Sequence, residues 1–206
     1  MYNRLGDSMK EKRELSKKFW WVVLSVSVAL VLLIVAGFAF FMNCKRPVIE
    51  ESENGGSIVL KSTNDLAGFK IENAVPTTDE VGMKADQEGK YFDFFIDVSL
   101  DNATYIDYEI SIAKDEKFST IPDDDIRIYL EQEDSGAYTT VLEPCKFTPL
   151  KNKSKIGTPV GSMVLFKTKK TKSLTDRYRL RMWLSDKSLV LNGNFGVEVF
   201  VNARTK

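Results

Sequence analysis

Hydrophobic and polar positions divide this chain into one long apolar run and a later series of short alternating segments. The run extends from Phe19 to Met42 and contains no charged side chain. At about 1.5 Å per residue, a helix of this length spans the roughly 30 Å hydrocarbon core of a bilayer. Such a helix makes its backbone hydrogen bonds internally, and Trp20 and Trp21 at its start suit the headgroup region. Residues 19–42 are therefore predicted to form one transmembrane helix.

The clearest alternation lies in the segment 91–100, YFDFFIDVSL, where every second residue is apolar. A period of two residues indicates a strand with one buried face. The same pattern recurs at 104–114, 125–132, 138–142, 162–168, 177–185 and 194–203, after weaker apolar pieces at 57–61 and 69–72. The polar stretch 101–103 is typical of a turn, which predicts that its two flanking strands form an antiparallel hairpin. Residues 75–90 are polar and are expected to form a loop.

These elements predict an all-β ectodomain behind one N-terminal transmembrane helix. The favoured architecture is an antiparallel β-sandwich of seven to nine strands, with a barrel as the second choice. The predicted organisation has four parts, which are a basic cytoplasmic tail (1–18), the transmembrane helix (19–42), an acidic linker (43–56) and an extracytoplasmic domain (57–206).

Positive charge close to the apolar run sets the expected orientation. The tail carries six basic residues, whereas only Lys45 and Arg46 follow the run before acidic residues begin. Basic flanks stay in the cytoplasm, so we expect a single-pass protein of the cell membrane with its N-terminus inside. A cleaved signal peptide and lipid attachment at Cys44 are the alternatives. Both are disfavoured, because the run is longer than a signal core of about 7–15 residues and large residues precede Cys44.

The formal net charge is zero, but the two halves of the predicted domain carry opposite charges. Residues 47–145 contain 23 acidic and 7 basic side chains, whereas residues 146–206 contain 3 acidic and 14 basic ones. One interpretation is that the basic half docks on an anionic surface or polymer. The other is that acidic strands pair with basic strands inside one sheet. We favour the second interpretation, because both halves are needed to build one core.

One strand carries the strongest candidate for ligand binding. Alternation places Arg177, Arg179, Arg181 and Trp183 on the same outward face. Guanidinium groups beside an indole suit a phosphate or sugar-phosphate polymer of the cell envelope. The alternative is that the arginines lie opposite carboxylates of neighbouring strands. A nucleic-acid partner is not expected, because this face is predicted to lie outside the cell.

Metal and catalytic signals are weaker. Asp123, Asp124 and Asp125 form the densest carboxylate cluster and are a candidate calcium site, although the EF-hand spacing is missing. The absence of histidine excludes His-based catalysis and His metal ligation, and no cofactor motif is present, so no cofactor is expected. The chain has two cysteines, Cys44 and Cys145, and the sequence does not decide whether they form a disulfide. Carboxylates on the strand faces leave a hydrolase as the enzymatic alternative.

The closing segments YRLRMWLS and NFGVEVFVNA, behind a single N-terminal anchor, resemble a loose group of uncharacterised extracytoplasmic proteins of Gram-positive bacteria. The matrix proteins camelysin and TasA are distant comparators of this group. The resemblance implies a surface-exposed β-sandwich and no assigned activity.

Taken together, the sequence predicts a membrane-anchored extracytoplasmic binding or assembly module without catalytic activity. We expect it to be a component of a cell-envelope or surface protein complex, contacting the bilayer through residues 19–42 and a protein or anionic polymer through its domain. Self-association as a surface or matrix protein is the alternative within binding. A carboxylate-based hydrolase of an envelope polymer is the alternative from another class.

Overall fold

The computed structural model describes residues 49–51, 56–62, 68–87 and 89–205. The predicted cytoplasmic tail and transmembrane helix, with Phe19, Trp20, Trp21 and Met42, lie outside the described residues, as does Cys44. Within the described ranges, no helix has the length and apolar character needed to cross a bilayer. Residues 47–206 form one compact unit.

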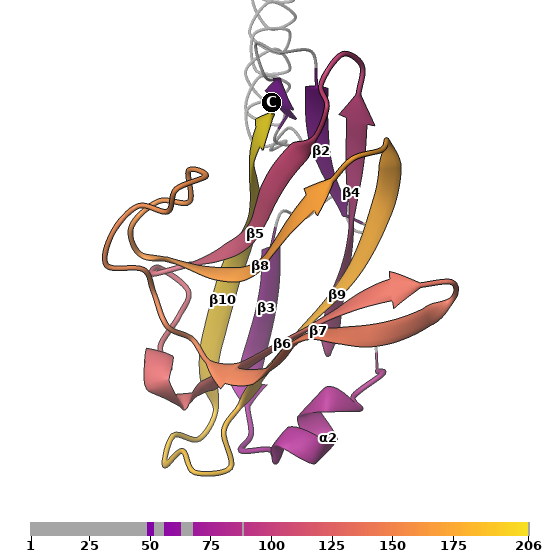
Figure 1. Cartoon of the computed structure of the whole chain (residues 1–206). Coiled ribbons are helices and arrows are strands. Elements are labelled where there is room, and N and C mark those ends of the chain that lie inside the picture. The colour runs from indigo at the N-terminus through magenta and orange to yellow at the C-terminus, as the bar shows by residue number, and fades with distance from the viewer. Residues whose placement is uncertain (1–48, 52–55, 63–67, 88, 206) are drawn as a thin grey trace, which may run out of the picture. The chain divides into compact units, whose positions relative to one another are not determined.

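The domain is all-β and consists of two antiparallel sheets (Figure 1). The six-stranded sheet has, in spatial order, β1 (Ile49–Glu51), β2 (Gly56–Ser62), β4 (Tyr91–Leu100), β9 (Leu174–Leu184), β6 (Ile126–Asp134) and β7 (Ala137–Lys146). The four-stranded sheet has β3 (Gly68–Ala74), β10 (Gly193–Thr205), β5 (Ile106–Lys114) and β8 (Ser162–Lys170). This arrangement is the predicted β-sandwich, with more strands than the sequence indicated.

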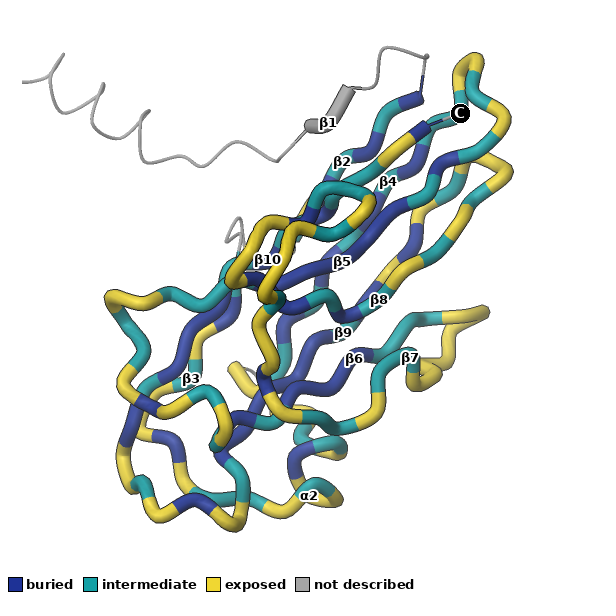
Figure 2. The backbone as a smooth tube through the Cα atoms, turned by 60° about the vertical axis from the view of Figure 1, so that its left-hand side comes forward, coloured by how far each residue is buried: buried dark blue, intermediate teal, exposed yellow. Residues whose placement is uncertain are grey.

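The core lies between the two sheets and follows the alternation in the sequence. In β4, Phe92, Phe94, Ile96 and Val98 are buried, while their neighbours are partly exposed. Residues of β5, β9 and β10 complete one continuous apolar cluster. Figure 2 shows buried residues along the strands and exposed ones on the connecting loops. The predictions of strands and of their inward faces are therefore confirmed.

The predicted hairpin between β4 and β5 is wrong. β4 pairs with β2 and β9, whereas β5 pairs with β10 and β8 in the other sheet. The turn at 101–105 therefore carries the chain from one sheet to the other. Alternation did not reveal this, because both sheets bury one face against the same core and give the same pattern.

Four smaller features refine the prediction. The turn between β6 and β7 uses Ser135 and Gly136, both with positive φ, which suits a tight two-residue hairpin. The segment expected to be a linker contains β1, which pairs with β2. The segment 75–90, expected to be loop, contains the short helix α2 (Asp79–Met83). A 3₁₀ turn, η1 (Asp123–Asp125), precedes β6.

The strand β10 runs the length of the domain and relates its two ends. It begins at Gly193, opposite Ala74, and ends at Thr205, whose methyl carbon lies beside Gly56 at the start of β2. Gly56 and Thr205 therefore lie at one end of the sandwich. The segment 75–90 and the loop 185–192 lie at the other end, which we call the distal end (Figure 1).

Candidate functional site

Helix α2 is fixed against the outer face of the six-stranded sheet by one ion pair and one close packing contact. Arg127 of β6 donates to Asp79 through Nε at 3.0 Å and through Nη2 at 2.6 Å. This interaction lowers the pKa of Asp79. Gly82 lies directly on the indole of Trp183, and a Cβ there would be 2.3 Å from the ring. A glycine is therefore required where α2 crosses β9.

The predicted arginine face exists, but its charges are largely neutralised within the sheet. Arg179 forms a bidentate pair with Asp93 at 2.7 and 2.8 Å, and its guanidinium lies 3.9 Å from the Tyr91 ring centre and 4.4 Å from that of Tyr138. The hydrogen bonds that Arg179 donates to Asp93, opposed by burial, raise the pKa of Arg179. Arg181 is buried. Its guanidinium contacts Glu131.

The other two members of this face differ in exposure. Arg177 has a side chain that is 57% exposed and contacts Glu133 at 3.5 Å. Trp183 is buried under α2, and its Nε1 donates to Asp79 at 3.2 Å. Of the four residues predicted to bind a ligand, only Arg177 therefore presents a largely free polar group to solvent.

The same register explains the opposite charges of the two halves. Acidic residues of β4, β5 and β6 face basic residues of β8 and β9, as in the pairs Asp93–Arg179, Glu109–Lys167 and Glu133–Arg177. Opposite charges across strands stabilise a sheet by about 0.2–1 kcal/mol per pair. The charge asymmetry along the chain therefore corresponds to pairing of acidic and basic residues within the sheets, which is the interpretation favoured from the sequence.

The three aspartates of η1 turn toward different partners. Asp123 accepts from Lys114 at 2.6 Å, Asp124 lies 3.6 Å from Lys146, and Asp125 accepts from Ser188 at 2.8 Å. In the described part of the chain, no three acidic or cysteine side chains are grouped as metal ligands. Each of the three candidate calcium ligands thus contacts a different side chain, and the three carboxylates do not converge on one point.

Two carboxylates on the strand faces, Asp97 and Glu109, have lowered pKa values. The pKa of Asp97 is lowered by hydrogen bonds from Lys61 and Thr175. Glu109 is fully buried on the outer side of the four-stranded sheet. Burial raises its pKa, but the ion pair with Lys167 and hydrogen bonds from Ser154 and Thr158 outweigh this effect and lower it overall. A general acid needs a raised pKa, so these groups are poorly suited to that role.

A buried polar cluster joins the two sheets. Asp176 of β9 accepts from Tyr108 of β5 at 2.5 Å, from Gln132 at 2.9 Å and from Lys170 at 2.9 Å. The Tyr108 and Tyr178 hydroxyl oxygens are 2.7 Å apart. Burial raises the pKa of both phenols. Because each member has a partner, the cluster is a cross-sheet connection rather than a free reactive group.

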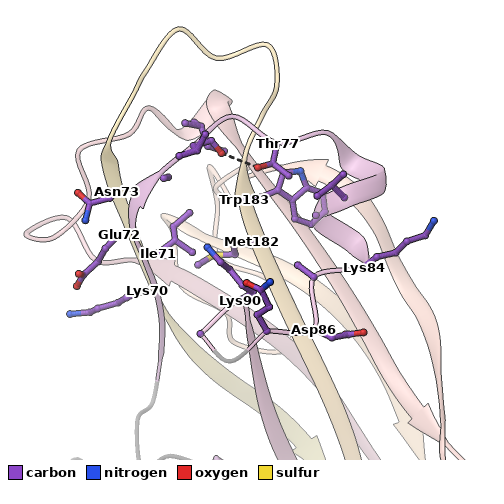
Figure 3. Close-up of a pocket in the computed structure, with 18 of the residues that line it drawn as sticks. Lys70, Ile71, Glu72, Asn73, Thr77, Lys84, Asp86, Lys90, Met182 and Trp183 are labelled. Carbon is purple, nitrogen blue, oxygen red and sulfur yellow. Dashed lines mark hydrogen bonds between the residues drawn. The ribbon is translucent and has the colours of Figure 1, made fainter.

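The distal end contains a pocket of about 800 Å³ that sequence reasoning did not predict (Figure 3). One wall is β3 with its end, residues 70–75, and the other is α2 with residues 84–87, 89 and 90. The last residues of β9, from Met182 to Leu184, also line it. Ile71 points toward Met182, whereas Lys70 and Glu72 point away from it (Figure 3).

Exposed apolar side chains gather at the same end. Val75 and Val81 line the pocket and are 65% and 61% exposed. Leu189 and Leu191, in the loop between β9 and β10, are 98% and 71% exposed. Apolar groups left in water at one end of a domain mark an interaction site. The distal end is therefore the strongest candidate functional site.

Part of this site had a signal in the sequence. Thr78 followed by Asp79 and Glu80 matches a helix start, with an N-cap residue and acidic residues in the first turn. The polar character of 75–90 concealed a helix of only five residues. The pocket itself had no signal, because it depends on how β3, α2 and β9 pack.

Comparisons with known proteins do not assign this site. No family model and no curated protein matches the chain. The PA14 domain of the MpAFP antifreeze protein aligns over 76% of each chain with 9% identity and a TM-score of 0.25. AvmM, which catalyzes macrocyclization in alchivemycin A biosynthesis, aligns over 78% of this chain and 95% of its own, with 7% identity and a TM-score of 0.27. Scores this low transfer neither fold nor activity, so the site rests on the geometry of this chain.

Proposed function

We propose that this protein is a membrane-anchored binding module that holds a protein partner at its distal end. Residues 19–42 anchor it in the bilayer, and the sandwich lies outside the cytoplasm as a non-catalytic component of a cell-envelope or surface complex. The observation that supports this most is that the pocket and four exposed apolar side chains share one end of the domain, opposite the end that holds Gly56 and Thr205.

The charges of the arginine face favour a protein over an anionic polymer as the partner at that face. Arg179 and Arg181 already contact carboxylates within the sheet, which leaves Arg177 as the one exposed cation of the predicted arginine face. A polymer of phosphates requires several free cations on one surface. Apolar side chains with a mixed polar rim are instead typical of protein interfaces.

Homotypic assembly is a second candidate, supported by the open edge of β7. Within the described residues β7 pairs only with β6, and most of the strand is exposed. Edge strands of this kind add strands from neighbouring molecules. Pro144 near its end and the charged Glu143 limit such addition, which is why this candidate ranks second.

Crosslinking of the full chain in intact cells, followed by mass spectrometry with surface and cytoplasmic fractions kept apart, tests the proposal. We expect a defined set of membrane or surface proteins. Recovery of the chain alone would favour homotypic assembly, and recovery of cytoplasmic proteins would contradict the proposed location.

A further inference from the structure

The distal pocket has an unusual wall, because β3 is the edge strand of the four-stranded sheet. Within the described ranges, β3 pairs with β10 and with no other strand. Its residues 70–74 line the pocket along most of the strand. Alternate residues of an edge strand direct their N–H and C=O groups away from the neighbouring strand. The pocket thus borders a row of backbone donors and acceptors that suits another strand.

The length of this edge is set by Asn73. This residue has a φ of 48°, and its N–H donates to the Asn194 side chain at 3.1 Å. The pairing of β3 with β10 is regular from Gly68 to Ile71 and shifts register before Ala74. At about 3.3 Å per residue, this regular part of the edge accommodates roughly four residues of an extended segment.

Side chains on the two faces of β3 differ in character. Ile71 points toward Met182 inside the pocket, and Lys70 and Glu72 point to the opposite face (Figure 3). A strand added at this edge continues the alternation, so every second side chain enters the apolar side and the others lie beside Lys70 and Glu72. The pocket therefore fits a segment with an apolar residue at alternate positions.

Charged residues at the rim of the pocket indicate which charged side chains the bound segment should carry. Lys70 pairs with Asp115 at 3.4 Å, Lys84 with Glu80 at 3.1 Å, and Asp86 with Arg181 at 2.6 Å. Among the described residues, the side chains of Glu72 and Lys90 have no ion-pair partner, and they come from opposite walls. One free charge of each sign complements a segment that carries a basic residue on the Glu72 side and an acidic residue near Lys90.

We infer that the distal pocket binds an extended peptide segment of a partner protein, which adds to β3 as a fifth strand of the four-stranded sheet. The backbone of β3 forms hydrogen bonds with the peptide main chain. Ile71 and Met182 contact an apolar side chain of the peptide, and Glu72 and Lys90 pair with its basic and acidic side chains. Strand addition of this type derives its affinity from main-chain bonds and its specificity from alternate side chains. The inference rests on the proposed binding role and specifies its ligand class.

Selection from a displayed library of random linear octapeptides tests this inference, with the full chain in dodecyl maltoside micelles and empty micelles for counter-selection. We expect enriched peptides to share alternating apolar residues with one basic and one acidic position. N-methylation of the peptide amides that face β3 should weaken binding at least about tenfold, because each methyl group removes one main-chain hydrogen bond to the edge. N-methylation of the intervening amides should leave binding unchanged.

A pair of charge reversals locates the binding edge without altering the core. Glu72→Lys should weaken binding of the selected peptides, whereas Glu143→Lys on β7, an edge strand of the six-stranded sheet, should not. Both residues are exposed, so both variants are expected to fold. Equal effects of the two variants, or binding that ignores backbone methylation, would overturn the inference.

Other occupants give distinct results. If a lipid co-purifies with the protein and no peptide is enriched, the occupant of the pocket is a lipid, and the inference is refuted. A dimer of the chain that Glu72→Lys dissociates would make a second copy the occupant and also refute it. Partner capture in cells without any enriched peptide would refute this inference alone and leave the proposed binding role standing.

Discussion

Replacing Arg179 with alanine separates the structural role of the arginine face from a ligand-binding role. Arg179 is 17% exposed in its side chain, forms two hydrogen bonds to Asp93 and stacks between two tyrosine rings. Charge-assisted hydrogen bonds contribute about 1.5–3 kcal/mol, and cation–π contacts add about 0.5–1 kcal/mol. We expect Arg179→Ala to lower the free energy of unfolding by about 2–3 kcal/mol.

Arg177 provides the matched control on the same strand and face. Its side chain is 57% exposed, and its contact with Glu133 at 3.5 Å is long. An exposed pair contributes about 0–1 kcal/mol, so Arg177→Ala should have little effect on stability.

Urea unfolding followed by circular dichroism measures both variants, and thermal unfolding checks them. A loss of 2–3 kcal/mol corresponds to a decrease in Tm of about 5–10 °C for a domain of this size. A double-mutant cycle with Asp93→Ala should give a coupling energy of about 1–2 kcal/mol. Equal stability losses for Arg177→Ala and Arg179→Ala, or no coupling to Asp93, would refute the assignment of Arg179 to the sheet.

The remaining predictions concern the contacts that hold α2 and the loop over β5. Gly82→Val should displace α2, because even a Cβ at this position would lie 2.3 Å from Trp183. We expect the free energy of unfolding to decrease by about 1–3 kcal/mol and the tryptophan emission to shift to the red. Val81→Ala is the control. Asp79→Asn should speed proteolysis within 75–90 without global unfolding, since it removes the charge that pairs with Arg127. The pKa of Glu109 is lowered in the folded state, so its contribution is present above the ordinary value of 4.5 and is lost as the pH falls through the folded value. Glu109→Gln should cost about 1–3 kcal/mol at pH 7 and flatten the decrease in urea midpoint between pH 5 and pH 3. A wild-type pH dependence in Glu109→Gln would contradict this assignment.

The sequence predicted correctly those features that depend on one strand alone, namely where the strand lies and which of its faces is buried. Alternation in the β4 and β10 segments gave both the strands and the inward faces, because burying one face of a sheet requires a period of two. It also placed Tyr108 and Tyr178 inside correctly. It did not place Asp176 there, since an interior carboxylate depends on partners from three other strands.

Features that depend on packing between distant segments were not predictable in the same way. Arg181 and Trp183 were assigned to the solvent side of β9, and they do point away from the core. They are nevertheless buried, because the segment 79–86 crosses over them. The pocket arises from the same crossing. Alternation predicted β9, whose last residues line the pocket, but it contained no indication of the pocket itself.

The most direct test of the distal binding end is site-specific photo-crosslinking in intact cells. Val81 lines the pocket and Val160 lies in the loop before β8, and both are 61% exposed, which makes them a matched pair of positions. A photoreactive phenylalanine analogue at each position reports which surface touches a partner. The account predicts a discrete protein adduct from position 81 and none from position 160. Adducts from position 160 alone, or the same adducts from both, would contradict it.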